Sequence, residues 1–336
     1  MAISVQILGR AGRDNAVLIK VDSGQNVCRL LFDCGQSCLD TVAPGDIQQI
    51  EHVCFSHFHM DHVSGFDGLF RMTYNRPAPP MHVWGPPGTT TIMSHRFHGY
   101  LWNLHGDQPG QWLVHDIQPD LVTTTEFRTS EAFQVARKLP DQPTIHTFSH
   151  AFPCFFEFIL LDHHTPSVGY VVREREKRNI DTTPLAELGL APGPWLQRLK
   201  DPDDDGTIET NDGQSVRLAV LRDRLLTVTK GESFAYLSDF HASSDEAVQQ
   251  IATTIAGCTT LVCESQYLSK DRDLALKNGH MTALDTGRLA RMANVETLIL
   301  IHISDRYSDD ERLALLAEAR SEFPNTTFPL EWELPA

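Results

Sequence analysis

Four side chains that can bind metal ions stand within six residues, in the segment His57-Phe58-His59-Met60-Asp61-His62. The apolar run before it, Val53 to Phe55, predicts a buried strand. Because side chains alternate along an extended chain, we expect the first two histidines and the aspartate to project to one side, with His62 supplied by the turn that follows. Nitrogen and oxygen ligands gathered at a strand end are typical of zinc sites, and manganese or iron are the alternatives. One short loop would then serve two ions.

A site for two ions needs more ligands than one loop can supply, and three later apolar runs end in suitable side chains. These are His163 or His164, Asp239, and His302. Each of them alone would more often be structural. Together with the histidine-rich segment they predict a complete site where several strands end.

The rest of the sequence is that of an ordinary folded protein of 336 residues, long enough for one large domain or two small ones. The opening residues alternate like a strand and lack the basic start and long apolar core of a signal peptide. No apolar run approaches the roughly 20 residues of a membrane span. We therefore expect a cytoplasmic protein.

The net charge limits which partners the protein can bind, and the cysteines indicate the redox state of its cellular compartment. The formal net charge of −16 argues against broad attraction to nucleic-acid phosphates, but metal ions and a local basic patch can supply positive charge where it is needed. Seven cysteines form no Cys-x-x-Cys pair and fall mostly in apolar runs, which predicts buried thiols in a reducing compartment. Chelation of a metal by Cys34 and Cys38 is the less favoured alternative.

The order of apolar runs predicts an α/β protein with two stacked sheets and helices outside them. The expected strands cover 3–8, 16–21, 29–33, 53–56, 81–85, 156–161, 168–172, 234–237, 261–263 and 298–301. The expected helices cover 64–72, 90–104, 245–253, 283–293 and 309–322. No internal repeat is evident, and we treat 1–336 as one domain.

One segment, 173–216, departs from the composition of the core. It opens on the charged run 173–178, contains Pro192-Gly193-Pro194 and ends beyond the acidic run 201–206. Such a concentration of charged, proline and glycine residues predicts an excursion, or arm, inserted between the two series of strands. Residues 171–200 hold six basic and four acidic side chains, a local charge of +2, which leaves −18 for the rest of the chain. The segment is either a phosphate-binding surface or a solvated charged face.

Several stretches of the chain are similar to the metallo-β-lactamase superfamily and, within it, to ribonuclease Z, the tRNA 3′-processing endonuclease. The superfamily resemblance rests on the segment 57–62 and on Leu31-Phe32-Asp33-Cys34-Gly35 upstream of it. The more specific resemblance rests on Gly279-His280-Met281-Thr282 and on His302-Ile303-Ser304-Asp305-Arg306-Tyr307. It implies an αββα sandwich of two mixed sheets flanked by helices, with a metal site at one edge of the sheets.

What the resemblance implies for the site can be stated residue by residue. Two zinc ions are expected, with Mn²⁺ or Fe²⁺ as alternatives. The first ion would be held by His57, His59, His163 and Asp239. The second would be held by Asp61, His62, Asp239 and His302. The family's spacing to the following Gly-Tyr pair favours His163 over His164.

The implied reaction is hydrolysis of a phosphodiester, with precursor tRNA as the leading substrate and a hydroxide bridging the two ions as the nucleophile. Asp61 is expected to orient or deprotonate the nucleophile, and His280 to protonate the departing 3′ oxygen. The alternative for His280 is a capping position before the helix that begins near Thr282. Glu264 is expected either to hold a histidine by a hydrogen bond or to be a surface carboxylate. Asp33 is expected to order the loop around the site.

The resemblance also implies that 173–216 is an RNA-binding arm and that the protein is a homodimer. Three stretches depart from the family's pattern: Ser238-Asp239-Phe240-His241 in place of Gly-Asp-Thr, Gly12-Arg13-Asp14-Asn15, and Gln36-Ser37 in place of Glu-Gly. These departures leave the metal ligands in place and bear on tRNA specificity. His241 either faces the site or is a simple loop histidine.

Other functions compete with this one. The same fold could hydrolyse a thioester or lactone, with zinc stabilising the oxyanion, although the arm and His280 argue against it. A phosphodiesterase acting on a small diester other than tRNA is a closer variant. A noncatalytic metal-binding or interaction protein would be expected to have lost a ligand, and all the expected ligands are present in the sequence.

Overall fold

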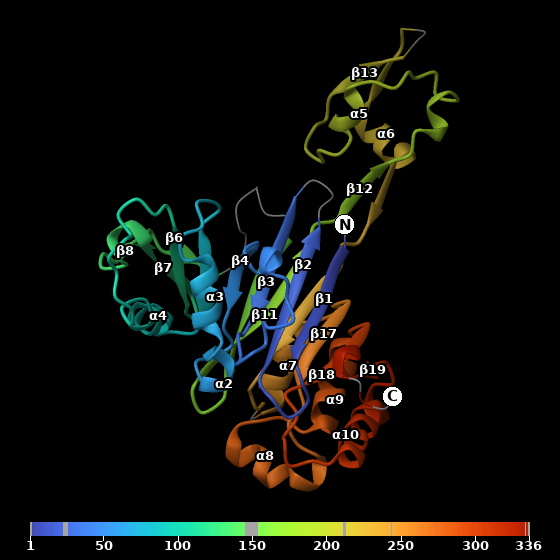
Figure 1. Ribbon diagram of the computed structural model, residues 1–336. Coiled ribbons are helices and arrows are strands. Elements are labelled where there is room, and N and C mark those ends of the chain that lie inside the picture. The colour runs from blue at the N-terminus through green and yellow to red at the C-terminus, as the bar shows by residue number, and fades with distance from the viewer. Residues whose placement is uncertain are drawn as a thin grey trace. The chain divides into compact units, whose positions relative to one another are not determined.

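The computed structural model describes residues 2–22, 26–144, 154–210, 213–242, 244–332 and 334. The chain divides into two compact units: the first combines Met1–Arg173 with Glu232–Ala336, and the second is Glu174–Gly231. Figure 1 shows the elements of both units, coloured along the chain. The first unit holds the two large sheets and every side chain predicted to bind metal.

The first sheet has nine strands in the order β1-β2-β3-β4-β5-β6-β7-β8, with β9 paired to β7. Their bounds are β1 Ala2–Gly9, β2 Asn15–Asp22, β3 Val27–Phe32, β4 Ile50–Cys54, β5 Met81–Gly85, β6 Gln111–Ile117, β7 Leu121–Arg128, β8 Arg137–Lys138 and β9 Gln142–Pro143. Strands β3 to β6 are parallel, and the strands on either side of them are antiparallel. Because parallel strands end at one edge of a sheet, the loops after β3 and β4 meet there.

The second sheet has six strands in the order β10-β11-β16-β17-β18-β19. Their bounds are β10 Cys154–Asp162, β11 Pro166–Glu174, β16 Ser233–Leu237, β17 Thr260–Glu264, β18 Thr297–Ile301 and β19 Thr326–Thr327. Strands β16 to β19 are parallel, and β11 joins β16 antiparallel. The residues that follow β16 and β18 therefore lie at one edge of this sheet.

Aromatic side chains from both sheets meet in the layer between them. Phe32 of β3 contacts Tyr170 of β11 and both Phe234 and Tyr236 of β16, with ring centroids 5.6, 5.2 and 5.4 Å apart. All four side chains are buried. Burial of one large apolar side chain stabilises a fold by roughly 1.5–3 kcal/mol, so this layer is a main source of stability.

Helices cover the outer faces of the two sheets (Figure 1). Those that follow strands of the first sheet are α1 Pro44–Ile47, α2 Met60–Val63, α3 Phe66–Thr73 and α4 Thr89–Phe97. Those that follow strands of the second are α7 Asp245–Thr254, α8 Arg272–Asn278, α9 Ala283–Ala293 and α10 Asp309–Glu322. Phe70 of α3 packs on Trp112 of β6, and Leu289 of α9 joins the core beside the second sheet. The predicted αββα sandwich is confirmed.

Local sequence explains the connection between α8 and α9. Helix α8 ends at Asn278 because Gly279 adopts a φ of 72°, which glycine tolerates without strain. Helix α9 begins after Thr282, whose side chain accepts a hydrogen bond from the N–H of Asp285. Thr282 is therefore the helix cap, and His280 is left in the short connection.

The prediction that the histidine-rich segment is extended as far as Asp61 is wrong from Met60 onward, although His59 itself has extended backbone, with φ of −67° and ψ of 155°. Strand β4 ends at Cys54, and Met60–Val63 form the single helical turn α2. Two backbone hydrogen bonds hold this turn, from the N–H of Cys34 to the carbonyl of His62 and from the N–H of Gly65 to the carbonyl of Cys34. The loop after β3 therefore holds the segment in this conformation. The alternation of side chains within the segment contains no information about these hydrogen bonds.

The prediction of a helix over 90–104 is wrong in its second half. Helix α4 ends at Phe97, and the chain turns so that Trp102 packs on Phe133 and donates its indole N–H to the carbonyl of Phe97. Burial of this large ring outweighs continuation of a helix through Gly99. Strands β6 and β7 were not predicted, because polar side chains such as Thr123 and Thr125 interrupt their apolar pattern.

The second unit has its own elements and its own small core. Its elements are β12 Lys177–Ile180, α5 Trp195–Arg198, β13 Thr207–Glu209, β14 Ser215–Arg217, α6 Leu218–Leu225 and β15 Leu226–Thr229. Strand β12 pairs with β15, and β13 pairs with β14. The apolar core consists of Leu185, Leu190, Leu199, Ile208, Leu218, Leu221 and Leu225. The unit ends at Gly231 rather than at Val216, because β15 returns to pair with β12.

Within the described residues, no helix combines the length and apolar character needed to cross a membrane. All seven cysteines are buried and none forms a disulfide. Burial raises the pKa of the Cys38 thiol to about 12, and that of Cys34 rises for the same reason. Both thiols therefore stay protonated at neutral pH, which does not favour chelation by this pair.

Candidate metal centre

Three polar residues near the ends of strands turn toward one edge of the sheets. Asp33 follows β3, Asp239 follows β16 after one intervening residue, and His302 follows β18. All three have left-handed backbone, with φ of 53°, 50° and 52°. Side chains with a Cβ atom rarely adopt this conformation, and such residues concentrate at functional sites. The fold thus holds three residues in an unusual backbone conformation at one edge of the sheets.

The histidine-rich segment reaches the same place from β4. His57 is completely buried. The turn α2 then presents Asp61, whose side chain is 47% exposed, and His62, whose side chain is only 5% exposed. His59 precedes α2 and is exposed. The segment therefore supplies both a buried wall and an open side to the site.

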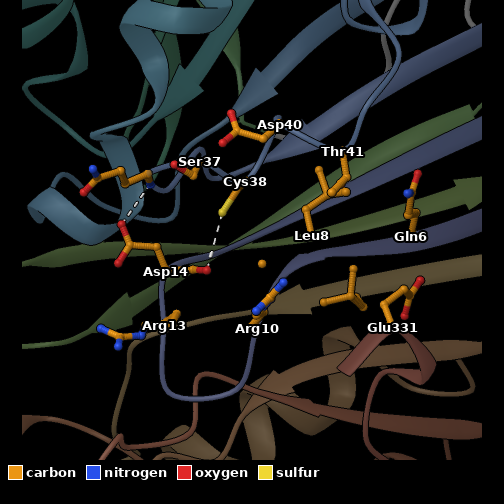
Figure 2. Close-up of a pocket in the computed structure, with 13 residues that line it drawn as sticks. Gln6, Leu8, Arg10, Arg13, Asp14, Ser37, Cys38, Asp40, Thr41 and Glu331 are labelled. Carbon is orange, nitrogen blue, oxygen red and sulfur yellow. Dashed lines mark hydrogen bonds between the residues drawn. The ribbon is translucent and has the colours of Figure 1, made fainter. Parts of the chain in front are cut away.

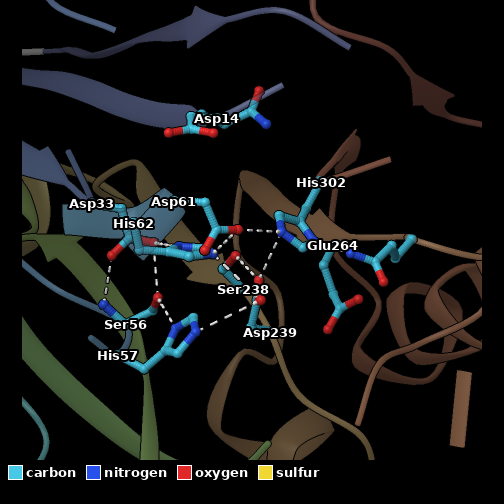
Figure 3. A network of polar contacts seen from close by, with 12 residues as sticks. Asp14, Asp33, Ser56, His57, Asp61, His62, Ser238, Asp239, Glu264 and His302 are labelled. Atoms are coloured by element: carbon cyan, nitrogen blue, oxygen red, sulfur yellow. Dashed lines mark hydrogen bonds and ion pairs between the residues drawn. The ribbon is translucent and has the colours of Figure 1, made fainter. Parts of the chain in front are cut away.

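One carboxylate, that of Asp239, lies at the centre of the site (Figure 3). Its Oδ2 atom lies 3.8 Å from Nε2 of His57, 3.3 Å from Nε2 of His62 and 3.6 Å from Nε2 of His163. Its Oδ1 atom lies 3.4 Å from Nε2 of His302. The carboxylate is buried and faces four imidazoles with its two oxygens.

Asp61 stands on one side of this centre. Its Oδ2 atom lies 3.4 Å from Nε2 of His62 and 3.6 Å from Nε2 of His302. The potential ligand atoms of these three residues all lie within 4.8 Å of one another. They form a first group of donors that could hold one ion together with Asp239.

Three histidines stand on the other side. The ring centroids of His57 and His59 are 4.4 Å apart, and that of His163 is 5.0 Å from each of them. Their potential ligand atoms also lie within 4.8 Å of one another. The metal cluster, as we call it, consists of His57, His59, His62, His163 and His302 together with Asp61 and Asp239.

His163, and not His164, belongs to the metal cluster. His163 is buried, and its Nδ1 lies 2.8 Å from the carbonyl oxygen of Gly279, which leaves Nε2 to face Asp239. His164 is exposed, and its Nε2 lies 3.2 Å from the carbonyl oxygen of Lys277. The two neighbouring rings thus have different surroundings.

Hydrogen bonds on the far side of the rings fix the direction of Nε2. Nδ1 of His62 lies 2.7 Å from Oδ2 of Asp33, which also accepts hydrogen bonds from the hydroxyls of Ser56 and Tyr236, each at 2.7 Å. Because the Ser56 hydroxyl gives its proton to Asp33, its oxygen is left to accept from Nδ1 of His57, 3.1 Å away. In the neutral rings both Nδ1 atoms then carry the proton, so that both Nε2 atoms can present a lone pair to an ion. Asp33 orders the site and is not placed as a ligand.

The unpartnered atoms of the cluster fit a metal ion. Nε2 of His57 and Nε2 of His62 are buried and have no hydrogen-bond partner among the described residues. A buried polar atom without a partner costs roughly 1–3 kcal/mol, so ligation of an ion would remove this cost. Imidazoles with carboxylates suit zinc, manganese or iron better than calcium or magnesium.

Charge interactions inside the cluster keep its carboxylates ionised. Burial and repulsion from His62 lower the pKa of His57 to about 2. Burial alone would raise the pKa of Asp61, but its contacts with His302 and His62 outweigh burial and hold that pKa well below its usual range. The same two histidines lower the pKa of the buried Asp239 carboxyl in the same way. Both aspartates therefore carry negative charge at neutral pH.

Glu264 is a buried anchor for His280, so the surface alternative for Glu264 is wrong. Its side chain is completely buried, and its Oε2 atom lies 3.1 Å from Nδ1 of His280. It also accepts hydrogen bonds from the N–H of Phe240, at 2.6 Å, and of Met281, at 3.2 Å. Burial disfavours the charged imidazole, but the Glu264 carboxylate outweighs burial and raises the pKa of His280. The His280 ring centroid lies 4.6 Å from that of His163, so His280 borders the cluster.

A cavity of about 680 Å³ lies between the β1–β2 hairpin and the loop that follows β3 (Figure 2). Its lining includes Arg10, Arg13, Asp14 and Gln36. Asp14 connects it to the segment after α2, since its Oδ2 accepts hydrogen bonds from the N–H of Gln36, at 2.8 Å, and the hydroxyl of Ser64, at 3.2 Å.

Some residues of the site carry no signal that sequence reasoning used. Ser56 directly precedes the histidine-rich segment, so adjacency to His57 could have indicated it. Tyr236 reaches Asp33 from the other sheet, 203 residues along the chain, and no local pattern predicts that contact. The side-chain amide of Gln266 lies 3.2 Å from Nδ1 of His302, which stands 36 residues further along the chain. No local pattern predicts this contact either.

Comparison with known proteins gives concordant matches. Residues 28–186 match the family model described as Beta-lactamase superfamily domain. Ribonuclease Z of Deinococcus radiodurans is 37% identical to this chain over 330 residues, which cover 98% of each protein. Ribonuclease Z of Bradyrhizobium sp. (strain ORS 278) is 30% identical over 308 residues, which cover 91% of this chain and 89% of that protein.

Solved structures match in fold. The short form of human tRNase Z superposes with a TM-score of 0.54 at 15% identity, covering 100% of both chains. The metallo-β-lactamase fold protein YhfI from Bacillus subtilis superposes with a TM-score of 0.56 at 14% identity, covering 97% of this chain and 95% of that one. At such identities the likeness concerns the fold alone.

Proposed function

The chain belongs to the ribonuclease Z family of metal-dependent hydrolases with the metallo-β-lactamase fold, and on this basis we propose that it is an endoribonuclease that removes the 3′ trailer of precursor tRNA. The observation that carries the proposal is the Asp239 carboxylate, which faces the Nε2 atoms of four histidines at 3.3–3.8 Å. Full-length similarity to two ribonuclease Z proteins supports RNA as the substrate.

We propose two divalent ions as the cofactor, zinc first and manganese or iron as alternatives. His57, His59, His163 and Asp239 would hold one ion. Asp61, His62, Asp239 and His302 would hold the other. The unpartnered Nε2 atoms of His57 and His62 support this assignment, because each of the two sets would use one of them.

Two such ions supply a nucleophile near neutral pH by lowering the pKa of water, and they polarise a phosphoryl oxygen. The protein's own side chains perform the remaining tasks. The ionised, half-exposed Asp61 carboxylate accepts a hydrogen bond from the attacking water and orients it. His280, held by Glu264 at the border of the cluster, delivers a proton to the departing 3′ oxygen. General acid catalysis of this kind typically contributes about 10²–10⁴-fold.

We propose that the second unit is the RNA-contacting arm. The residues that contact phosphate differ from those suggested by the charge of 171–200. Counted over Glu174–Gly231, nine lysines and arginines face eleven aspartates and glutamates, a net charge of −2, so the local excess of positive charge over 171–200 does not extend to the unit. Arg198 is paired with Asp204 at 2.7 Å. The exposed Lys200, Arg217 and Arg224 form no ion pair with the described residues and are the better candidates for phosphate contact.

Cleavage of two substrates by one variant tests the catalytic part of the proposal. The metal-loaded protein should hydrolyse bis(p-nitrophenyl) phosphate and should cut an unprocessed tRNA precursor after its discriminator base. His59→Ala should abolish both activities. Persistence of either activity in that variant contradicts the assignment of the cluster. If the original protein cleaves the small diester but not the precursor, its substrate is a small diester and not tRNA.

Replacement of the second unit tests the RNA-binding part. Arg173 of β11 and Ser233 of β16 are paired neighbours in the antiparallel ladder, so a short turn containing Asn-Gly can join the strands in place of Glu174–Gly231. The shortened protein should keep hydrolysis of bis(p-nitrophenyl) phosphate and lose precursor cleavage. Equal precursor cleavage by both proteins would exclude the arm from substrate binding.

A homodimer in the cytoplasm, expected from the family resemblance and from the sequence, stays part of the proposal. Light scattering of the purified protein at several concentrations checks the oligomeric state.

A further inference from the structure

A second pair of histidines lies beside the metal cluster and takes no part in it. His164 follows the cluster residue His163, and His241 stands two residues after Asp239. Their ring centroids are 5.3 Å apart, the same separation as between the rings of His62 and His302 in the cluster. Two imidazoles at this separation can direct one nitrogen each at a common ion.

Hydrogen bonds determine which nitrogen of His164 is available. Its Nε2 lies 3.2 Å from the carbonyl oxygen of Lys277, which can only accept, so Nε2 carries the proton. Nδ1 is left with its lone pair in the neutral ring. Donation of one ring N–H to a backbone carbonyl is the usual arrangement of a metal-binding histidine, and His163 forms the same kind of bond with Gly279.

His241 contributes a nitrogen without a partner. Its Nδ1 atom is buried and forms no hydrogen bond within the described part of the chain, as is also true of Nε2 of His57 and Nε2 of His62 in the cluster. The ring as a whole is only half-buried, so the pair can be reached from solvent. A buried nitrogen of this kind is available to a partner other than the protein, and the neighbouring His164 ring supplies a second nitrogen for the same partner.

The backbone holds the two rings in place. The N–H of His241 donates to the carbonyl oxygen of Asp162 at 2.9 Å, and the N–H of His164 donates to Oδ1 of the same residue at 2.9 Å. Gly279 allows the approach from the other side, since a Cβ atom there would lie 3.2 Å from Cδ2 of His164. The Asp162 carboxylate also adds negative charge beside the pair.

From these contacts we infer that His164 and His241 form a third divalent-cation site at the rim of the metal cluster, selective for ions that prefer imidazole, such as Zn²⁺, over Mg²⁺ or Ca²⁺. An ion held there adds positive charge beside the metal cluster in a protein whose formal net charge is −16. It would attract the phosphates of an anionic substrate.

Zinc titration of the loaded protein tests this site. The protein is first saturated with zinc and desalted, and its two retained equivalents are measured by mass spectrometry of the metal. Calorimetric titration with Zn²⁺ should then show one further equivalent. His164→Ala and His241→Ala should each weaken this binding by at least about tenfold while retaining the two tightly held ions, which shows that the fold and the cluster are intact.

His105→Ala is the matched control. Nδ1 of His105 is also buried and has no hydrogen-bond partner among the described residues, but its ring lies beside Trp102, with ring centroids 6.5 Å apart, rather than beside a second imidazole. This variant should bind the additional ion as the original protein does. Absence of a further equivalent, or unchanged binding by both His164→Ala and His241→Ala, overturns the inference. The readout is stoichiometry rather than cleavage, so the outcome does not depend on whether the protein acts on tRNA.

Discussion

Two groups of histidines draw residues from β4 or from the loop that follows it, and they differ in what surrounds their ring nitrogens. The metal cluster begins after the end of β4 and directs Nε2 atoms at the Asp239 carboxylate. The second group consists of His52 on β4, His82 on β5 and His115 on β6, and we call it the histidine ladder. Both groups are dense and largely buried, so histidine density alone does not distinguish them.

In the histidine ladder the ring nitrogens bond to other side chains. Nδ1 of His82 lies 2.9 Å from Nε2 of His115, and Nδ1 of His115 lies 2.8 Å from the hydroxyl of Thr124. The Trp84 indole N–H donates to Nδ1 of His52 at 3.1 Å. The rings of His52, His82 and His115 stack on one another or on Trp84.

Potential metal ligands near the ladder do not change this difference. Donor atoms of Cys28 and Glu51 lie within 4.8 Å of one in His52. Because the Trp84 indole can only donate, Nδ1 of His52 is an acceptor and the neutral ring carries its proton on Nε2. Neither nitrogen then has a free lone pair for an ion. Unpartnered nitrogens around one carboxylate, rather than the number of histidines, therefore distinguish the candidate ion site from the ladder.

Removal of the shared carboxylate should have the largest effect. Asp239→Asn keeps the size of the side chain but removes the charge that faces four histidines. We expect hydrolysis of bis(p-nitrophenyl) phosphate to fall by at least about 10³-fold, because this carboxylate would be shared by both ions. Initial rates and metal content measure the change. Retention of both ions and more than a tenth of the rate would show that the carboxylate is not shared.

The Glu264–His280 pair should have the next largest effect. Glu264→Gln keeps a hydrogen-bond acceptor but removes the charge that raises the pKa of His280. We expect the rate of precursor cleavage to fall by about 10²-fold and its alkaline limb to move to lower pH, because the proton donor would lose its proton earlier. A rate–pH profile measures this. An unchanged alkaline limb would assign Glu264 a purely structural role.

Asp33 should have a smaller effect, exerted through His62. Asp33→Asn weakens the hydrogen bond that holds Nδ1 of His62 at 2.7 Å. We expect ion affinity to fall by about 10–100-fold, with the maximal rate largely recovered at saturating metal. Competition with a chelator measures the affinity. Loss of activity that excess metal does not restore would place Asp33 among the ligands.

The histidine ladder should affect stability and leave the reaction nearly unchanged. Burial lowers the pKa of His82 from 6.5 to about 4, and burial also lowers the pKa of His52 and of His115. Between pH 6.5 and 4 the unfolded chain therefore binds more protons than the folded one, so stability is fully present above pH 6.5 and falls as the pH drops. For His82 alone, which is partly exposed, we expect a loss of about 2 kcal/mol.

Denaturant unfolding at pH 7 and pH 4.5 measures this loss, and His82→Asn should reduce it. The same variant should hydrolyse bis(p-nitrophenyl) phosphate within about twofold of the original rate, because the ladder has no place in the reaction. Loss of bound metal in His82→Asn would contradict the distinction between the two groups of histidines.

Most strands and helices of the first unit could be predicted from the sequence, because their apolar side chains recur with the period of the element that buries them. Two of the failures share a physical cause. Helix α4 is shortened by the docking of Trp102, and the segment 57–62 is bent by hydrogen bonds to Cys34. In both cases a contact between distant residues outweighs a local preference, and no periodic pattern contains that information.

The sequence alone shows which donors are present: a dense segment of histidines and aspartates, with Asp239, His302 and either His163 or His164 placed at the ends of apolar strands. Ligand chemistry depends on side-chain type, so it can be predicted from residue identity and spacing. Only the tertiary structure decided where the lone pairs point. That direction depends on partners such as Asp33, 29 residues from His62, and Gly279, 116 residues from His163. Such partners become neighbours only when the strands of each sheet pair and the chain folds around them.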